Sequence, residues 1–494
     1  MRGFRQRLGA ALVAVVLGAT VAACSPGNAQ PQTKTPDGGR PDAPANLTLA
    51  TAANRESTGV VAQGGPGAPY NYGPTVMLDG GKVRMWWCSQ YPDAGPPGDD
   101  ILYGESTSLD GPFTGPGSTV PPAVLSGNPG QFDGMHTCDP SVVRAGGTYY
   151  LYYTGAANDH ALGNAIGLAT STDGLTWARA DTPIVGPSHD VHRDNLYGTG
   201  QPSAVYLDGW FYLMFTDTSG KDAGWNGAGQ FVLRAKDPRF AAGVESLSDN
   251  GFTAVTSTTA PRTMSVVDAF SAELEWSDAL GAFVIAHETQ DGTTLTFWNR
   301  DFTAHPYRAV VVPGPWEEGP GLVRRPDGHA PASESDPCGR IPVDVIRATR
   351  LGEAHAPTDL RHYGLDLTGL TGCADQQRAL GVLDGFAMPS PARTMDLVVA
   401  GKVVRIDRRS VAEQLATHVL DQRVGALDGA PVAAHLSSGA RALEAAGLGL
   451  GFLLDDGKLW PVHPASVASL NGSTVELVSA AQWRAHPQAA PLGK

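Results

Sequence analysis

The chain has 494 residues, a formal net charge of −14, and high contents of glycine (61) and proline (38). An acidic chain gains nothing from phosphate backbones or anionic lipid headgroups, so nucleic acid is excluded as a partner, whereas a neutral glycan is compatible with the charge. The length exceeds what one hydrophobic core usually holds and predicts two domains.

The N-terminus predicts export. Arg2, Arg5 and Arg7 precede an apolar run over residues 8–23, which is too short for a typical transmembrane helix and is typical of a secretory signal. The run ends Val-Ala-Ala-Cys24, which resembles the lipobox of bacterial lipoproteins, where the cysteine is acylated. An ordinary signal peptide with a chance cysteine is the alternative.

On the lipoprotein interpretation, residues 1–23 are a signal peptide and Cys24 carries the lipid. Residues 24–46 are rich in proline, glycine and polar side chains and are expected to form a disordered tether. The mature protein is then held at the cell membrane by the lipid on Cys24 and faces away from the cytoplasm.

An internal repeat follows the tether. One unit runs DPSVV from Asp139, then a Gly-Gly turn, the aromatic run YYLYYT, a third strand over residues 165–170, and the turn STDG. This is the pattern of an inner strand, a tight turn, an aromatic strand and a further strand. Similar units begin near Gly73 and Gln201, and looser ones near Ala272 and Gly319.

The repeats predict the fold class: mainly β, with a five-bladed β-propeller over residues 47–353. One small sheet cannot bury both of its faces, so neighbouring sheets stack around an axis. Residues 47–62 are expected to supply the outer strand of the last blade. A β-sandwich is the competing fold, but it does not explain why the same turn recurs at the same point of successive units.

Four cysteines besides Cys24 predict two disulfides in an exported chain. Cys88 ends the second strand of the first unit and Cys138 precedes the inner strand of the next, so we expect a Cys88–Cys138 bond. The same reasoning pairs Cys338, in the last hairpin loop, with Cys373. The cysteine and histidine spacings predict no structural zinc, and no cofactor is expected.

The run DPSVVRAGGTYYLYYTG with IGLATSTDGLTW resembles the five-bladed propeller glycoside hydrolases, namely the family 43 β-xylosidases and arabinanases and the related family 32 β-fructosidases. The resemblance covers residues 60–350. It implies that inner strands begin at a central substrate funnel and that carboxylates there act as general acid, general base and orienting group.

Asp139 matches the Asp-Pro position of the second blade, which implies the role of the orienting or pKa-tuning carboxylate. The first blade should carry the general base near Gly73, but Tyr72 and Gly73 stand there. The third blade should carry the general acid and has Gln201, which cannot donate that proton. The family's catalytic triad is therefore absent from its usual places.

Other carboxylates are candidates for the missing roles. Glu318 lies in Glu-Glu-Gly-Pro, which resembles the family's Glu-Gly-Pro acid motif but in the fifth blade. Asp268 and Glu273 flank the fourth inner strand, although the alternation around Glu273 is typical of a solvated strand face. With Asp139, these are the candidate catalytic residues. The candidate substrate-binding residues are Gln201, His136, Tyr72, His287 and Trp316, the last as a stacking platform for a sugar ring.

Residues 354–494 lack the repeat and predict a small α+β domain. We expect helices over residues 374–384 and 410–424 and hairpins over residues 395–406 and 447–462. No catalytic motif is recognisable there.

The sequence thus favours an exported glycosidase that acts on pentose-containing glycans, such as xylosides or arabinofuranosides. Two alternatives stay open. The first is a glycan-binding lipoprotein with a degenerate site, which Gln201 and the first blade favour. The second is a scaffold that uses the propeller face to bind protein partners.

Overall fold

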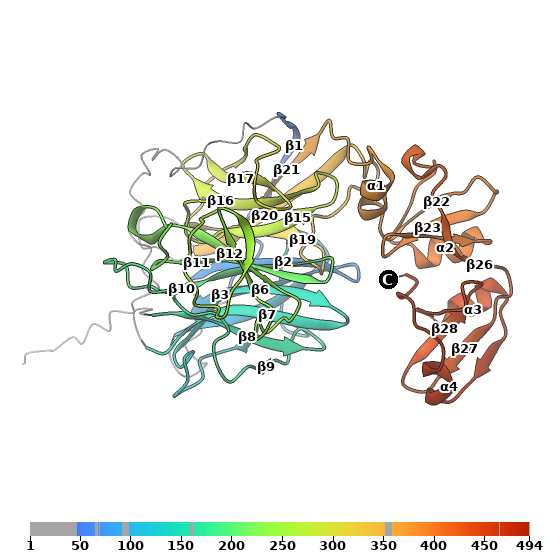
Figure 1. Ribbon diagram of the computed structural model, residues 1–494, viewed down its shortest axis with the longest axis horizontal. Helices are drawn as coiled ribbons and strands as arrows, with labels where there is room; N and C mark the ends of the chain where they lie inside the picture. The colour runs from blue at the N-terminus through green and yellow to red at the C-terminus, as the bar shows by residue number, and fades with distance from the viewer. Residues whose placement is uncertain are drawn as a thin grey trace, which may run out of the picture.

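The computed structural model describes residues 47–64, 68, 70–90, 98–158, 163–350, 358–463 and 465–493. The expected signal peptide, the lipidation site Cys24 and the tether lie outside these residues. Figure 1 shows a large β-rich part beside a smaller C-terminal part, coloured orange to red. The described chain is mainly β, as the repeats predict. Within it, no helix has the length and apolar character needed to cross a membrane.

The β-rich part contains four sheets. The first, with eight strands, is ordered β1 (Ala50–Glu56), β21 (Thr358–Thr368), β20 (Arg340–Arg350), β19 (Gly321–Arg324), β2 (Asn71–Asp79), β3 (Lys82–Gln90), β4 (Asp99–Ser106) and β5 (Ala123–Leu125). The second is β6 (His136–Ala145), β7 (Thr148–Ala156), β8 (Ala165–Ser171) and β9 (Ala178–Arg179). The third is β10 (Thr199–Leu207), β11 (Trp210–Asp217), β12 (Gln230–Ala235), β13 (Glu245–Ser248) and β14 (Gly251–Ala254), with the 3₁₀ turn η1 (Trp225–Gly227) before β12. The fourth is β15 (Glu273–Ser277), β16 (Ala282–Thr289), β17 (Gly292–Asn299) and β18 (Val310–Pro313).

The eight-stranded sheet contains two of the repeat units. Its halves are joined by a short parallel pairing of β19 with β2, in which Val323 lies opposite Val76 and Arg324 opposite Met77. Hydrogen bonding therefore gives four sheets where the repeats predict five separate ones. The first and last inner strands approach closely enough to share backbone hydrogen bonds, which sequence units cannot reveal.

The same sheet extends further along the chain than expected. β1 pairs with β21 and supplies the outer strand that residues 47–62 are expected to provide. β21 also pairs with β20 along its whole length, from Arg340 opposite Thr368 to Arg350 opposite Thr358. Residues 358–368 therefore belong to this sheet, past the boundary expected after residue 353.

Aromatic side chains fill the interfaces between consecutive sheets. Ring centroids lie 6.5 Å apart for Trp86 and Tyr149, which join the first and second sheets. They lie 5.2 Å apart for Tyr150 and Phe211 in the next interface. In the third, Tyr212 packs on Phe283 at 5.1 Å. The aromatic strands of the repeat thus supply the core, since large rings bury much apolar area and pack in tilted or edge-to-face pairs.

Both expected disulfides are confirmed. Cys88 and Cys138 are bonded, which ties β3 to β6, and Cys338 is bonded to Cys373 at the other end of the β-rich part.

The inner strands enter at one end of the sheets through residues with left-handed backbone. The φ angles are +53° at Gly73, +46° at Asp139, +51° at Gln201, +51° at Ser271 and +58° at Gly319. In β2, β6 and β10 the pairing register shifts at this point, as in a β-bulge. Such a bulge re-aims a side chain, and a left-handed non-glycine residue is strained by about 1–2 kcal/mol. Strain repeated at equivalent positions marks this end as a candidate site.

The axis between the inner strands is filled. Arg324 donates to the carbonyl oxygens of Ala204 and Leu274 at 3.0 and 2.7 Å, and its Nη2 lies 2.6 Å from Glu273 Oε1. At the far end the turn over residues 325–329 crosses the axis. Its carbonyls accept N–H groups from three inner strands: Pro326 from Arg144, Asp327 from Tyr206, and Gly328 from Trp276.

The C-terminal part begins with α1 (Gln376–Val382) and contains two further sheets. The first consists of β25 (His418–Val419), β22 (Phe386–Pro389), β23 (Met395–Val399), β24 (Lys402–Ile406) and β26 (Val432–Leu436), with α2 (Arg409–Leu415) and η2 (Gly425–Leu427). The second consists of β29 (Leu459–Val462), β28 (Gly449–Leu453), β27 (Ala442–Ala445) and β30 (Val475–Leu477), with α3 (Ser466–Asn471) and α4 (Ala480–Arg484).

The two C-terminal sheets are built the same way. In each, a strand pairs with the following hairpin, a short helix follows, and a strand after the helix returns parallel to the first. Gly401-Lys402 recurs as Gly457-Lys458, and the helices share Ser-Val-Ala at residues 410–412 and 466–468, both 56 positions apart. Residues 386–436 and 442–492 are thus two copies of one unit, which the sequence reading missed because few residues are identical.

The expected C-terminal hairpins are confirmed, but the helix expected over residues 410–424 is too long. α2 ends at Leu415, and β25 follows because it pairs with β22 in parallel. Helix-like apolar spacing over residues 410–424 therefore continues into a strand whose pairing partner lies elsewhere in the sequence.

The C-terminal part packs at the end of the sheets that lies away from the left-handed entries. A Cβ on Gly381 of α1 would lie 3.3 Å from Asp278, just past the end of β15. The apolar cluster that contains Val284 and Val345 continues into Val382 and Phe386. In Figure 1, α1 accordingly lies between the two parts.

Candidate active site

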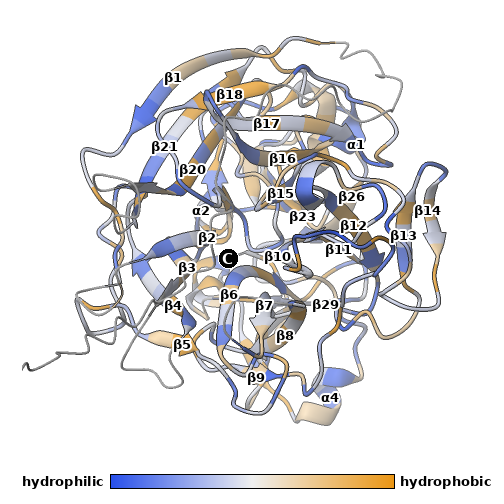
Figure 2. Cartoon of the chain, turned by 90° about the vertical axis from the view of Figure 1, so that its left-hand side faces the viewer, coloured by the Kyte–Doolittle hydropathy of each residue, from blue (hydrophilic) through white to orange (hydrophobic). Residues whose placement is uncertain are grey.

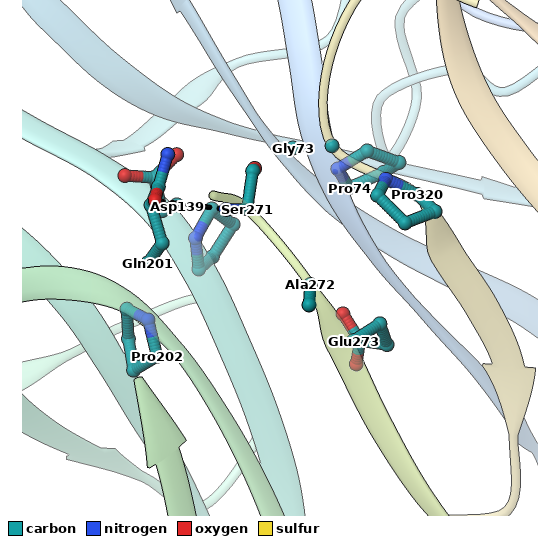
Figure 3. Close-up of a pocket in the computed structure, with 11 residues that line it drawn as sticks. Gly73, Pro74, Asp139, Gln201, Pro202, Ser271, Ala272, Glu273 and Pro320 are labelled. Carbon is teal, nitrogen blue, oxygen red and sulfur yellow. Dashed lines mark hydrogen bonds between the residues drawn. The ribbon is translucent and has the colours of Figure 1, made fainter. Parts of the chain in front are cut away.

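Five inner strands, β2, β6, β10, β15 and β19, begin around one small cavity (Figure 3). Its lining residues are Gly73, Pro74, Asp139, Pro140, Gln201, Pro202, Ser271, Ala272, Glu273, Gly319 and Pro320. The enclosed space is about 20 Å³, close to the volume that one water needs. Figure 3 shows Asp139, Gln201 and Ser271 side by side, with Glu273 further along β15.

Asp139 is the carboxylate at the start of β6 and lines the cavity, as expected. Its Oδ2 accepts hydrogen bonds from Thr154 Oγ1 at 2.9 Å and from Tyr197 Oη at 3.4 Å. Its Oδ1 faces Gly73, where a Cβ would lie 3.2 Å away. Burial and the charge of Asp99 raise the pKa of Asp139 to about 6, against the opposing effect of the Thr154 and Tyr197 hydrogen bonds. Thr154 and Tyr197 orient Asp139. Thr154 ends the aromatic run of the repeat, whereas Tyr197 lies outside the repeated units.

Glu318 adjoins the cavity residue Gly319. Burial, together with the nearby charges of Asp139, Asp99 and Glu317, raises the pKa of Glu318 to about 8. Among the described residues, none donates a hydrogen bond to the Glu318 carboxylate. Glu318 is not itself among the cavity-lining residues, but the charge of Asp139 acts on it, so the fold brings a carboxylate of the second unit near one of the fifth.

Asp99, at the start of β4, is a third carboxylate near the cavity, and the sequence patterns did not predict it. It is fully buried, and its Oδ2 lies 3.0 Å from His136 Nδ1. It raises the pKa of both Asp139 and Glu318. The only available signal was the acidic pair at residues 99–100 before the third strand. His136, expected to bind substrate, is buried against Asp99 and is not among the cavity-lining residues.

Gln201 lines the cavity, but its side-chain oxygen is engaged in structural contacts. Oε1 accepts hydrogen bonds from Thr216 Oγ1 at 2.8 Å and from the Ser271 N–H at 2.9 Å. The Gln201 N–H donates to Thr154 Oγ1, which itself donates to Asp139. Gln201 therefore connects two sheets and helps to fix the hydroxyl that orients Asp139.

Glu273 departs from expectation in its environment. All five residues of β15 are buried, so the alternation around Glu273 does not mark a solvated face. Burial raises the pKa of Glu273, and the Arg324 guanidinium opposes that rise. Although it lines the cavity, Glu273 is paired with the axial Arg324 and belongs to the structural filling of the axis.

Asp268 is not among the cavity-lining residues. Its carboxylate lies beside the loop before η1, where a Cβ on Gly224 would be 2.8 Å from Oδ2, and Ser265 Oγ lies 3.5 Å from Oδ1. Four residues separate Asp268 from β15, and its side chain contacts the loop before η1.

The remaining candidates line other parts of the structure. Trp316 is half-buried and donates its Nε1–H to Thr289 O at 2.6 Å. His287 is half-buried beside Thr296, and burial lowers its pKa to about 4. Tyr72 is buried in an apolar cluster with Cys138. None of the three is among the cavity-lining residues.

Donor atoms of Cys88, Asp99 and Cys138 lie within 4.8 Å of one another, close enough for a metal site. The two cysteines form a disulfide, however, so they have no thiolate to offer. This group of residues does not form a metal centre.

No protein-family model matches the chain. It is 29% identical over 131 residues to a probable arabinan endo-1,5-α-L-arabinosidase A of Aspergillus flavus, covering 26% of this chain and 40% of the relative. It is 31% identical over 119 residues to the arabinan endo-1,5-α-L-arabinosidase A of Aspergillus niger, covering 24% and 35%. The chain thus spans two fifths or less of these relatives, which are glycoside hydrolases.

Solved structures that are similar are also glycoside hydrolases. A family 117 enzyme from Zobellia galactanivorans shares 11% identity over 65% of this chain and 92% of its own, with a TM-score of 0.45. The catalytic domain of a GH62 α-L-arabinofuranosidase from Coprinopsis cinerea shares 13% over 64% and 97%, with a TM-score of 0.40. A GH43 β-xylosidase/α-arabinofuranosidase from a compost metagenome shares 14% over 63% and 95%, with a TM-score of 0.41. Scores this low do not by themselves establish a shared fold.

Proposed function

We propose that the protein is a glycoside hydrolase that cleaves pentose-containing glycans, with Glu318 as the general acid and Asp139 as the general base. The observation that carries the proposal is the pair of carboxylates beside one cavity with different raised pKa values. Glycoside hydrolysis needs one carboxyl group that is protonated and one that is ionised at the working pH.

The pKa values assign the roles. Between about pH 6 and pH 8, Asp139 is ionised, because its pKa is about 6, and Glu318 is protonated, because its pKa is about 8. Glu318 can then donate its proton to the leaving oxygen while Asp139 activates water. The resemblance implies an orienting role for Asp139, but Glu273 is paired with Arg324, so Asp139 is the available base.

Asp99 takes the tuning role in this scheme. Its charge raises the pKa of both catalytic carboxyls, and His136 holds it in place. The Thr154 and Tyr197 hydroxyls fix one oxygen of Asp139 and leave the other directed at the space above Gly73. That space could receive the attacking water, since glycine leaves it open.

The architecture and location are part of the proposal. We infer that the four sheets of the β-rich part form a five-bladed propeller, in which the eight-stranded sheet contains the first and last blades. The substrate class follows the arabinanase relatives, which match part of the chain. We further propose that Cys24 is lipidated and holds the enzyme at the outer side of the cell membrane.

A glycan-binding protein without catalysis is the second candidate. Gly73 provides no carboxylate opposite Asp139, and Gln201 is engaged in structural hydrogen bonds. On this proposal a sugar binds over the mouth of the same cavity and is not cleaved.

Hydrolysis of nitrophenyl pentosides, arabinan and xylan separates the two candidates. The hydrolase proposal expects activity in the wild type with a bell-shaped pH profile whose limbs lie near pH 6 and pH 8. Asp139→Asn should abolish it. A wild type that binds one of these glycans in affinity electrophoresis and cleaves none would replace the hydrolase with the binding protein.

A further inference from the structure

The most exposed tryptophan of the β-rich part lies on a loop at the cavity end. Trp225 has 64% of its surface exposed, in the turn η1 between β11 and β12. Val191 and Leu196, on the loop that leads into β10, are exposed at 36% and 50%. Three large apolar side chains in water on two adjacent loops are unusual, because burial of such surface is normally favourable.

The two loops are held rigidly by polar groups that point inward. Arg193 donates to the carbonyl oxygens of Thr218, Gly220 and Ala223 at 2.8 to 3.0 Å. Asp190 Oδ2 accepts from the N–H groups of Lys221 and Arg262. The charged side chains are thus directed at backbone groups, and the apolar ones remain in solvent.

Hydrogen bonds connect the turn η1 to the candidate active site. Asn195 donates to Asn226 O at 2.9 Å and accepts from the Tyr197 N–H at 3.1 Å. The Tyr197 hydroxyl lies 3.4 Å from Asp139 Oδ2. On its other side the turn contacts Asp268 through Gly224. Three successive hydrogen bonds therefore connect the turn that carries Trp225 to the proposed base.

We propose that Trp225 forms the stacking platform of a glycan subsite outside the cavity, so that the enzyme binds chain-like saccharides more tightly than single pentosides. This inference rests on the proposed function. The cavity encloses little space, so sugar units beyond the cleaved linkage must lie on the surface around it. A rigid indole offers an apolar face to the C–H side of a neutral sugar ring at little cost in conformational entropy.

The test compares Trp225→Ala, Trp225→Phe and the control Lys221→Ala, which lies on the same loop and uses only its backbone in the contacts above. The substrates are a nitrophenyl pentoside and linear oligosaccharides of increasing length built from the same pentose. We expect Trp225→Ala to raise KM about tenfold for the long oligosaccharides, as loss of one stacking contact would. KM for the nitrophenyl pentoside should not change, Trp225→Phe should recover most of the loss, and Lys221→Ala should behave as the wild type.

Affinity electrophoresis in gels with arabinan or xylan separates this inference from the proposed function. If the wild type is inactive but retarded, and Trp225→Ala is not retarded, the subsite stands and the hydrolase fails. If the wild type cleaves long oligosaccharides and Trp225→Ala cleaves them with unchanged KM, the subsite is wrong and the hydrolase stands. An equal loss on the nitrophenyl pentoside would also overturn the subsite, since it would show damage to the catalytic centre.

Discussion

The sheets of the β-rich part hold buried charged groups at both ends. Carboxyl pKa values are raised at the cavity end, and that of Asp278 is lowered at the far end. At the cavity end, Asp139 and Glu318 have raised pKa values of about 6 and 8. At the far end, Asp278 lies 3.0 Å from His329 and 3.2 Å from Arg325, and these cations help to lower its pKa to about 2. Burial raises the pKa at both ends, so the difference comes from the neighbouring charges.

The far end illustrates a satisfied network. His329 Nδ1 faces Asp278 and Nε2 faces Tyr206 O, so both ring nitrogens meet acceptors and the pKa of His329 is raised by Asp327 and Asp278. This network adjoins the C-terminal part through α1. Ion-paired carboxylates such as Asp278 stabilise the folded chain. Carboxyl groups without a neighbouring cation have raised pKa values, which suit them to proton transfer.

Removal of the proposed acid should have the largest effect. Glu318→Gln should lower kcat about 10²–10⁴-fold on substrates with poor leaving groups, the usual contribution of general acid catalysis. A dinitrophenyl pentoside needs no protonation of its leaving group, so its kcat should fall far less. The control Glu317→Gln should stay within a few-fold of wild type. Equal losses on both substrates would contradict the assignment.

The ion pair on the axis should matter for folding instead. Arg324→Met leaves Glu273 buried without its cation and should lower the free energy of unfolding by about 3–5 kcal/mol in urea denaturation. Adding Glu273→Gln should restore part of the loss. Arg409→Met, in an exposed i,i+4 pair with Glu413, is the matched control and should change stability little. A loss no larger than the control's would show that the axial pair is not structural.

The two disulfides lie at opposite ends of the β-rich part, and their removal should have different effects. Replacing Cys338 and Cys373 by serine should lower the free energy of unfolding by about 2–4 kcal/mol and leave kcat/KM unchanged. Replacing Cys88 and Cys138 should lower both quantities, because Cys138 precedes the proposed base and Cys88 lies beside Asp99. Both quantities are measured on the same samples, by denaturation and by kinetics. An unchanged kcat/KM after replacement of Cys88 and Cys138 would show that this disulfide does not support the active site.

Stability should also respond to pH with opposite signs at the two ends. Asp278 has a lowered folded pKa, so its contribution of about 2 kcal/mol is present above pH 4 and is lost as the pH falls toward 2. Glu318 has a raised folded pKa, so its contribution is present below pH 4.5 and is lost as the pH rises through about 8. Thermal melts should therefore show Asp278→Asn less stable than wild type near neutral pH and Glu318→Gln more stable above pH 8. Parallel pH profiles of the two variants would contradict this picture.

The smallest effect tests the tuning role of Asp99. Asp99→Asn should move both limbs of the pH profile of kcat/KM downward by roughly half a pH unit, because one negative charge near both carboxyls is removed. Glu317→Gln should move only the upper limb, since Glu317 raises the pKa of Glu318 alone of the two. If the pH profile shifts in neither variant, Asp99 and Glu317 do not set the pKa values of the two catalytic carboxyls.

The repeat, the inner strands near Asp139 and Gln201, and the disulfide pairing could all be predicted from the order of residues, because turns, aromatic strands and cysteines recur locally at fixed points of each unit. The same order also placed Glu318 beside a strand start. Three features could not be predicted in this way: Glu273 pairs with Arg324, the charge of Asp99 acts on Asp139 and Glu318, and Gln201 accepts hydrogen bonds from Thr216 and Ser271. Pairing, burial and pKa depend on which chain-distant groups approach within a few ångströms, and the order of residues does not contain those distances.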